Sequence, residues 1–167
     1  ALVQQYGSID ASIELCGVDL SEERRTGEEV RRLGIDAYPD IPSAVAARHP
    51  EDIVIGCDTV VDVDGTVFGK PRDAEDAKRM LRALSGKTHQ VHTGVCIAKG
   101  DRAEHFVDSC KVTFFPLGEE EIAFYTATPE PYDKAGAYAI QGRAALWLDR
   151  IEGDYYTIMG LPVSRTV

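Results

Sequence analysis

The segment 53–63, Ile-Val-Ile-Gly-Cys-Asp-Thr-Val-Val-Asp-Val, restricts the fold of this chain more than any other feature. It is an almost continuous apolar run, which is typical of a buried β-strand. Asp64-Gly65 closes the run, and an Asp-Gly pair between β-branched segments is a strong signal for a tight hairpin. We therefore expect residues 66–68 to return antiparallel to this strand.

The rest of the chain predicts helices and further strands around this hairpin. An amphipathic helix is expected over residues 73–84, with Asp73 as its N-cap, Asp76 in a capping-box position and Gly86 at its end. Other expected elements are a helix start at Ser21, helices over 43–48 and 119–126, strands over 90–98, 104–115 and 144–151, and an irregular path over 155–162. Because this order lacks a strict βαβ alternation, it predicts a mixed-sheet α/β or α+β domain.

The balance of charge limits the partners that the chain can take. Its 167 residues include 28 acidic and 18 basic ones, which gives a formal charge of -10. Binding to duplex nucleic acid or to an anionic membrane needs a face rich in Lys and Arg, so neither is expected as a partner. No apolar run approaches the ~20 residues of a membrane-spanning helix. The four cysteines form no CxxC pair, which favours reduced thiols in a cytoplasmic protein over disulfides or a zinc site.

Two ionisable residues near the hairpin are candidates for a functional site. Asp58 lies inside the apolar run, where a carboxylate is costly to bury without an ionic or hydrogen-bonding partner. A satisfied structural aspartate is an equally good interpretation. Lys70, the first lysine of the chain, follows the returning strand, so the hairpin could bring it near Asp58. Taken alone, a lysine in a turn is more often only solvated.

A third candidate is the segment 133–142, Asp-Lys-Ala-Gly-Ala-Tyr-Ala-Ile-Gln-Gly. Small residues beside Lys134 and the Gln141 carboxamide suit a place where the backbone approaches a ligand closely. The alternative is a tightly packed turn in which Lys134 and Asp133 pair on the surface. On local grounds this alternative is the better interpretation.

Three common hydrolase signatures are missing from the sequence. The segment 65–71 resembles a phosphate-binding loop superficially, but it lacks the GxxxxGK[ST] spacing and ends in proline. There is no GxSxG elbow of a serine hydrolase and no HExxH helix of a metal site. A Walker nucleotidase, a serine hydrolase and a helical zinc hydrolase are therefore not supported.

Taken together, the candidate segments resemble the central signature of the Maf family, the septum-formation-protein-like nucleotide pyrophosphatases. The matching positions follow in order along most of the chain at compatible spacings. They include Cys57-Asp58-Thr59-Val60-Val61, Asp64-Gly65, Gly69-Lys70-Pro71, Leu84-Ser85-Gly86, Thr93-Gly94-Val95, Asp133-Lys134-Ala135-Gly136-Ala137-Tyr138, Ile140-Gln141-Gly142, Ile151-Glu152-Gly153 and Gly160-Leu161-Pro162.

This resemblance implies an α/β, Maf/ITPase-like fold, a single domain in which helices flank an elongated mixed sheet with a central cleft. It implies hydrolysis of dTTP and UTP to the monophosphate and pyrophosphate with a divalent metal cation, Mg or Mn. Modified pyrimidine nucleotides are further expected substrates. The expected partner is thus a nucleoside triphosphate, and a homodimer and a cytoplasmic location are also expected.

The resemblance also implies roles for the charged candidates. Asp58 matches the family's proton acceptor, and Lys70 matches its phosphate-contacting lysine. Lys134 is a further candidate for binding the phosphates of the substrate. Glu22, or Glu23 beside it, matches an acidic residue near the metal and the phosphates. The metal ligands themselves stay unknown.

Two polar candidates match positions of the dTTP/UTP-preferring branch, Thr59 and Gln141. A carboxamide offers an adjacent donor and acceptor, which fits the carbonyl and N3–H edge of uracil or thymine. Because a flipped amide can serve other bases, the preference that Gln141 gives is a soft one.

The chain is expected to be one domain over residues 1–167 that lacks the family's N-terminal strand, with its Ser-Pro-Arg-Arg-type segment, and its C-terminal helix. The alternative function is therefore a catalytically weak nucleotide-binding protein that regulates cell division. An acidic scaffold without a ligand is the least supported hypothesis, because Asp58, Lys70 and Gln141 would then each need a separate structural explanation.

Overall fold

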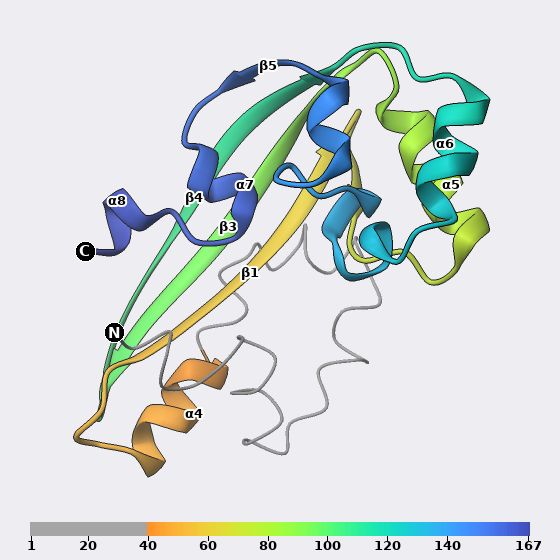
Figure 1. Cartoon of the computed structure of the whole chain (residues 1–167). Coiled ribbons are helices and arrows are strands. Elements are labelled where there is room, and N and C mark those ends of the chain that lie inside the picture. The colour runs from red at the N-terminus through yellow and green to blue at the C-terminus, as the bar shows by residue number, and fades with distance from the viewer. Residues whose placement is uncertain (1–39) are drawn as a thin grey trace. The chain divides into compact units, whose positions relative to one another are not determined.

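The computed structural model describes residues 40–167, which contain a five-stranded sheet in the order β2-β1-β3-β4-β5 (Figure 1). The strands are β1 Val54–Val63, β2 Thr66–Phe68, β3 Thr88–Lys99, β4 Arg102–Phe114 and β5 Leu148–Glu152. The α-helices are α4 Asp40–Arg48, α5 Ala74–Leu84, α6 Glu119–Thr126, α7 Tyr155–Met159 and α8 Val163–Thr166. Short 3-10 helices cover η3 Glu130–Asp133, η4 Ala135–Ala137 and η5 Arg143–Trp147.

One sheet with helices beside it confirms the α/β class expected from the sequence. The strands are antiparallel, where a mixed sheet was expected. Tight turns explain this for two of the pairs. The connections from β1 to β2 and from β3 to β4 are too short for a parallel crossover, so each of these pairs is antiparallel. No helix of the described part is long and apolar enough to cross a membrane. The expected helix start at Ser21 and the first part of the expected 1–167 domain lie outside the described residues.

The hairpin between β1 and β2 forms as the Asp-Gly pair predicts. Val63 pairs with Thr66 across the turn. Both turn residues have left-handed φ angles, 52° at Asp64 and 76° at Gly65, as a type I′ turn requires. The Asp62 side chain accepts a hydrogen bond of 2.9 Å from the Gly65 N–H. The turn therefore fixes where the chain leaves the sheet toward Lys70.

The described residues pack as two compact units, and each is described by itself. The first contains residues 40–57 and 95–106, and the second contains 58–94 and 107–167. In the first unit, Pro42 and Ala46 lie one turn apart in α4 and are buried. Proline is tolerated in the first turn of a helix, where its missing N–H has no helical partner to lose. The helix therefore begins at Asp40, before the expected residue 43.

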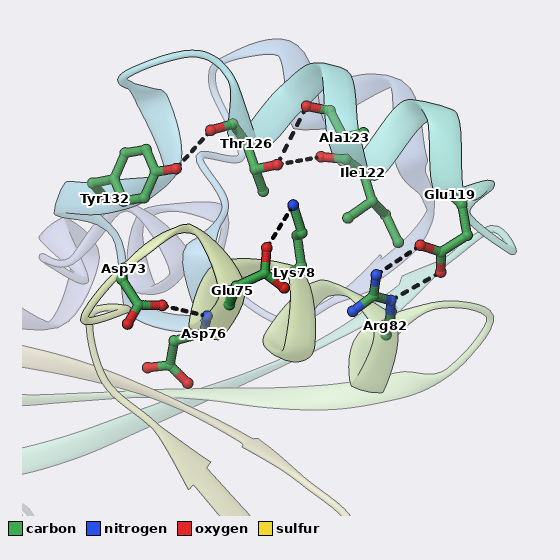
Figure 2. A network of polar contacts seen from close by, with 10 residues as sticks. All are labelled: Asp73, Glu75, Asp76, Lys78, Arg82, Glu119, Ile122, Ala123, Thr126 and Tyr132. Atoms are coloured by element: carbon green, nitrogen blue, oxygen red, sulfur yellow. Dashed lines mark hydrogen bonds and ion pairs between the residues drawn. The ribbon is translucent and has the colours of Figure 1, made fainter.

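The core of the second unit forms between the sheet and the paired helices α5 and α6. The apolar face predicted for α5 is buried, and it belongs to one cluster with residues from β1, β3, β4 and α6; these include Ala77, Met80, Leu81, Leu84, Val61, Val91, Val112, Ile122 and Tyr125. Figure 2 shows α5 and α6 side by side, joined at their exposed rim by the Arg82 guanidinium on the Glu119 carboxylate at 2.9 and 2.7 Å. Apolar burial thus joins the helices to the sheet.

The chain after α6 departs most from the expected elements. The strand expected over 144–151 is wrong in its first half, where residues up to Trp147 form η5 and the strand begins only at Leu148. Trp147 is buried against Tyr125, with ring centroids 4.7 Å apart. Leu148 pairs with Phe114 of β4, so the strand begins where a partner strand is available.

The segment 155–162, expected to be irregular, contains the short helix α7. Asp154 caps this helix, because its carboxylate accepts a hydrogen bond of 2.9 Å from the Tyr156 N–H. The helix ends at Gly160, whose φ angle of 107° is left-handed. An aspartate N-cap and a glycine C-cap are both sequence signals, so this helix could have been predicted.

His89 is a buried titratable residue in the aromatic part of the core. Its side chain is 1% exposed, and its Nε2 atom lies 2.9 Å from the Tyr138 hydroxyl. The imidazole packs edge-on against the rings of Phe114 and Tyr138. Its Nδ1 atom has no hydrogen-bond partner within residues 40–167. Burial lowers the pKa of His89 from 6.5 to about 4, so the imidazole is neutral at pH 7.

This histidine predicts a loss of stability in mild acid. Between pH 6.5 and 4 the unfolded chain protonates His89 and the folded chain does not, so the free energy of unfolding falls as the pH falls through this window. Over this window the free energy of unfolding decreases by about 3 kcal/mol. Above the pKa that His89 has in the unfolded chain, this residue causes no change of stability with pH. Urea unfolding at several pH values should show this slope for the wild type and lose it in His89→Phe. The variant His49→Gln, which removes an exposed imidazole, should keep it, and an unchanged slope in His89→Phe contradicts the account.

Candidate functional site

The two lysines predicted for the site are bound to one carboxylate. The Lys70 Nζ atom lies 2.8 Å from Asp133 Oδ1, and the Lys134 Nζ atom lies 3.1 Å from Asp133 Oδ2. Hydrogen bonding to Lys70, opposed by burial and assisted by Lys134, lowers the pKa of Asp133. The surface pair of Lys134 with Asp133, expected from the alternative of a packed turn, is present, and Lys70 joins it from 63 residues away. Two positive charges therefore gather at one place on an acidic chain.

The loop that carries Lys70 is fixed at both ends. The buried Asp76 carboxylate accepts hydrogen bonds from the Arg72 N–H at 3.2 Å and from the Arg79 guanidinium at 2.7 Å. Burial raises the pKa of Asp76, but the hydrogen bonds from Arg79 and Arg72 outweigh it and lower the pKa overall. On the other side, the Gly136 N–H donates to the Gly69 carbonyl at 3.1 Å. Lys70 thus projects from a loop held against both α5 and η4.

The expected capping box of α5 is only half formed. The Asp73 carboxylate accepts a hydrogen bond of 2.8 Å from the Asp76 N–H, as the N-cap prediction requires (Figure 2). The Asp76 side chain does not return to the cap residue but binds Arg72 and Arg79. Hydrogen bonds between a carboxylate and a guanidinium are charge-assisted and strong, and through its bonds to Arg72 and Arg79 the Asp76 carboxylate anchors the Lys70 loop.

Asp58 and Thr59 are neighbours on β1, and both are partly buried. The Thr59 hydroxyl lies 2.8 Å from the Thr93 hydroxyl of β3, and the Thr93 hydroxyl donates to the Thr157 carbonyl of α7 at 2.6 Å. These contacts join Thr59 of β1 to β3 and α7. The closeness of Lys70 to Asp58 stays a prediction.

Gln141 is exposed in the turn between η4 and η5. Glu130 holds this turn, because its Oε1 atom accepts hydrogen bonds from the Tyr125 hydroxyl at 3.0 Å and from the Arg143 N–H at 2.8 Å. The Tyr125 oxygen in turn accepts from the Ala139 N–H at 3.1 Å. Backbone groups on both sides of Gln141 are therefore bound, directly or through Tyr125, to one carboxylate.

Sequence reasoning did not single out Glu130, Thr93 or the bridging role of Asp133. No local pattern reports contacts between residues far apart in the chain, and Thr93 is separated from Thr59 by 34 residues. Glu22 lies outside the described residues. Within the described part, no group of three or more His, Cys, Asp or Glu side chains could hold a metal ion. The metal ligands therefore stay unknown.

Glycine at position 142 is required by the closeness of Glu130. A Cβ atom added at Gly142 would collide with Glu130 Oε1 and lie 2.5 Å from its Cδ. Gly142→Ala should therefore lower the free energy of unfolding by about 1 to 3 kcal/mol, measured by urea titration. The cost should shrink in a Glu130→Ala background, where the colliding atoms are gone. Gly69→Ala is the matched control, since its Cβ meets no atom within 4 Å; an equal cost of Gly142→Ala in both backgrounds contradicts the account.

Comparison with known proteins places these features in a family. The Maf-like protein family matches residues 2–167. The chain is 52% identical over 125 residues to the dTTP/UTP pyrophosphatase of Bacillus cytotoxicus, covering 75% of this chain and 65% of that protein. Proteins of the same name from Bacillus velezensis and a Geobacillus species are 53% and 56% identical over 124 residues, covering 74% of this chain and 66% and 67% of those proteins.

The chain thus spans about two thirds of the length of these curated relatives, and slightly less for the two Bacillus proteins. The family match extends over nearly the whole chain and includes the segments that carry Asp58, Lys70 and Gln141. It confirms the resemblance inferred from the sequence. The chain belongs to the Maf family.

Proposed function

We propose that this chain hydrolyses the α-β phosphoanhydride bond of dTTP and UTP, releasing the nucleoside monophosphate and pyrophosphate. The observation that carries the proposal is the convergence of Lys70 and Lys134 on Asp133. A triphosphate needs several cations in one place, and a chain with a formal charge of -10 offers few such places. The dTTP/UTP pyrophosphatase relatives support the same function.

The two lysines suit the binding of a polyphosphate. Asp133 is exposed and balances both ammonium groups, so the phosphate oxygens of a ligand would meet cations that are already positioned. Exposed ion pairs of this kind add little to stability. Their value lies in positioning, because ordered cations stabilise the charge that develops on the leaving pyrophosphate without a cost of reorganisation.

Asp58 is the proposed proton acceptor for the attacking water. It is partly buried on β1, and a carboxylate with limited access to solvent can orient a water and accept its proton. A divalent cation, Mg or Mn, is part of the proposal. Magnesium is commonly held by one or two carboxylates together with substrate phosphates, and Asp58 suits this mode better than a metal cage made only of protein groups. The cation would neutralise phosphate charge and lower the pKa of bound water.

Thr59 and Gln141 are the proposed contacts to the pyrimidine base. The Gln141 carboxamide can donate to a carbonyl oxygen of uracil or thymine, and the Glu130 contacts hold its turn in place. Modified pyrimidine nucleotides, a homodimer and a cytoplasmic location stay predictions. The alternative of a catalytically weak regulator of cell division is not favoured, because the curated relatives carry the name of an enzyme.

The roles of Asp58 and Lys70 predict large losses of activity on substitution. With UTP and Mg²⁺, Asp58→Asn and Lys70→Ala should each lower the rate of pyrophosphate release about 100-fold or more, because one removes the proton acceptor and the other a phosphate contact. Release is measured with a coupled pyrophosphate assay, and circular dichroism melting shows whether the variants fold.

Matched controls exist for both substitutions. Asp62 lies on the same strand as Asp58 but binds its own hairpin turn, and Lys87 is an exposed lysine held by Asp64 at 2.7 Å. Asp62→Asn and Lys87→Ala should stay within about twofold of the wild type, as expected for substitutions outside a site. Full activity in folded Asp58→Asn and Lys70→Ala proteins would show that the site is assigned wrongly.

A further inference from the structure

A series of hydrogen bonds, buried at Thr93 and Thr157, crosses from β1 through β3 to α7. The Thr59 and Thr93 hydroxyl oxygens lie 2.8 Å apart, and the Thr93 oxygen lies 2.6 Å from the carbonyl oxygen of Thr157. Thr93 and Thr157 are both 0% exposed. Water therefore has no access to these two groups, and each must satisfy its hydrogen bonds within the chain.

The chemistry of the groups decides the direction of both hydrogen bonds. A carbonyl oxygen only accepts, so the single proton of the Thr93 hydroxyl goes to Thr157. Thr93 then has no proton left for Thr59, and the proton between the two hydroxyls must come from Thr59. The Thr59 hydroxyl has thus committed its proton, and it can offer a ligand only its lone pairs. Within this network Thr59 is therefore the donor to Thr93, and toward a ligand it is an acceptor.

The last member of this series of hydrogen bonds, Thr157, is itself held in place. The Thr157 hydroxyl donates to the Asp108 carboxylate of β4, and the Arg165 guanidinium donates to the same carboxylate at 2.6 Å. Burial raises the pKa of Asp108, but these two hydrogen bonds outweigh it and lower the pKa overall. The Thr157 N–H also donates to the Asp154 carbonyl at 3.1 Å. The carbonyl that orients Thr93 therefore cannot turn away.

We propose that Thr93 is a positioning residue that fixes Thr59 as a hydrogen-bond acceptor, and that this makes the site select a pyrimidine with a proton on N3. The inference rests on the proposed function. Uracil and thymine carry an N3–H donor, whereas N3 of cytosine is an acceptor that would face the lone pairs of Thr59. A phosphate oxygen is also an acceptor, so the network directs Thr59 toward the base and away from the phosphates.

The fixed direction of the Thr59 hydrogen bond gives a selectivity for uracil over cytosine that the Gln141 carboxamide cannot give. A carboxamide presents a donor or an acceptor after a half-turn of its terminal group, so Gln141 alone accommodates either uracil or cytosine. A hydroxyl whose proton is committed has no such freedom. Rejection of a wrong ligand by an unmatched polar group is stronger than selection by an added attraction.

Two substitutions at Thr93 separate hydrogen-bond direction from packing. Thr93→Val keeps the shape but removes the hydroxyl, so Thr59 becomes free to accept from uracil or to donate to cytosine. Thr93→Ser keeps the hydroxyl and loses one methyl group, so it should keep the direction. The rates of cleavage of UTP and CTP are measured for each protein, and thermal melting shows that both variants fold.

The ratio of kcat/KM for UTP over CTP should fall about tenfold or more in Thr93→Val and stay near the wild-type value in Thr93→Ser. In the wild type, 3-methyl-UTP, which lacks the N3 proton, should be cleaved as poorly as CTP, whereas 5-methyl-UTP should be cleaved as well as UTP. A UTP/CTP ratio that Thr93→Val leaves unchanged overturns the inference. Equal cleavage of 3-methyl-UTP and UTP also overturns it. So does a preference that depends on the 2′-hydroxyl group of the sugar, measured as the difference between cleavage of UTP and of dUTP.

Failure of the proposed function gives a different result. A wild-type protein that cleaves none of these nucleotides refutes the proposed activity but leaves the selection testable by calorimetric titration with UTP and CTP. Tighter binding of UTP, lost in Thr93→Val and kept in Thr93→Ser, then supports the inference. Equal binding of the two nucleotides, or binding of neither, overturns it.

Discussion

The bridge from Lys70 to Asp133 to Lys134 is the interaction on which the candidate site depends. One carboxylate binds the ammonium group of each lysine, at 2.8 and 3.1 Å. Without it, two positive charges that repel each other would have to stay close together on the surface. The bridge also joins the loop after β2 to the turns after α6, segments far apart in the sequence. In a chain with a formal charge of -10, this is where a polyanion could bind.

Residues that were not expected in the site hold the expected site residues in place. Asp76 fixes the loop of Lys70 through Arg72, and Glu130 holds the turn that carries Gln141. Thr93 determines what the Thr59 hydroxyl can offer to a ligand. In each case a buried or partly buried polar group is satisfied by a backbone or side-chain partner from another element. Such supporting contacts let a site keep its geometry before a ligand arrives.

The sequence predicted the local parts of this structure and missed the long-range ones. The Asp64-Gly65 hairpin, helix α6 and the N-cap Asp73 follow from neighbouring residues, and all are confirmed. The boundary at Trp147 could not be predicted in this way, because it depends on where β4 offers a partner.

The same limit applies to the candidate site. Its residue types were readable from the sequence, and two of the expected residues, Lys70 and Lys134, meet at Asp133. Their supporting partners were not readable, because Asp133 lies 63 residues from Lys70 and the hydroxyl contact of Thr59 lies 34 residues away. Glu22 falls outside the described residues, and no side chain described here tests its role.

The products of one reaction test the central claim, cleavage between the α- and β-phosphates of a pyrimidine nucleotide. The protein is incubated with UTP and Mg²⁺, and the phosphorus NMR spectrum is followed over time. We expect the three signals of UTP to be replaced by those of UMP and pyrophosphate in equal amounts, with no UDP. Signals of UDP and orthophosphate, or an unchanged UTP spectrum, would contradict the account.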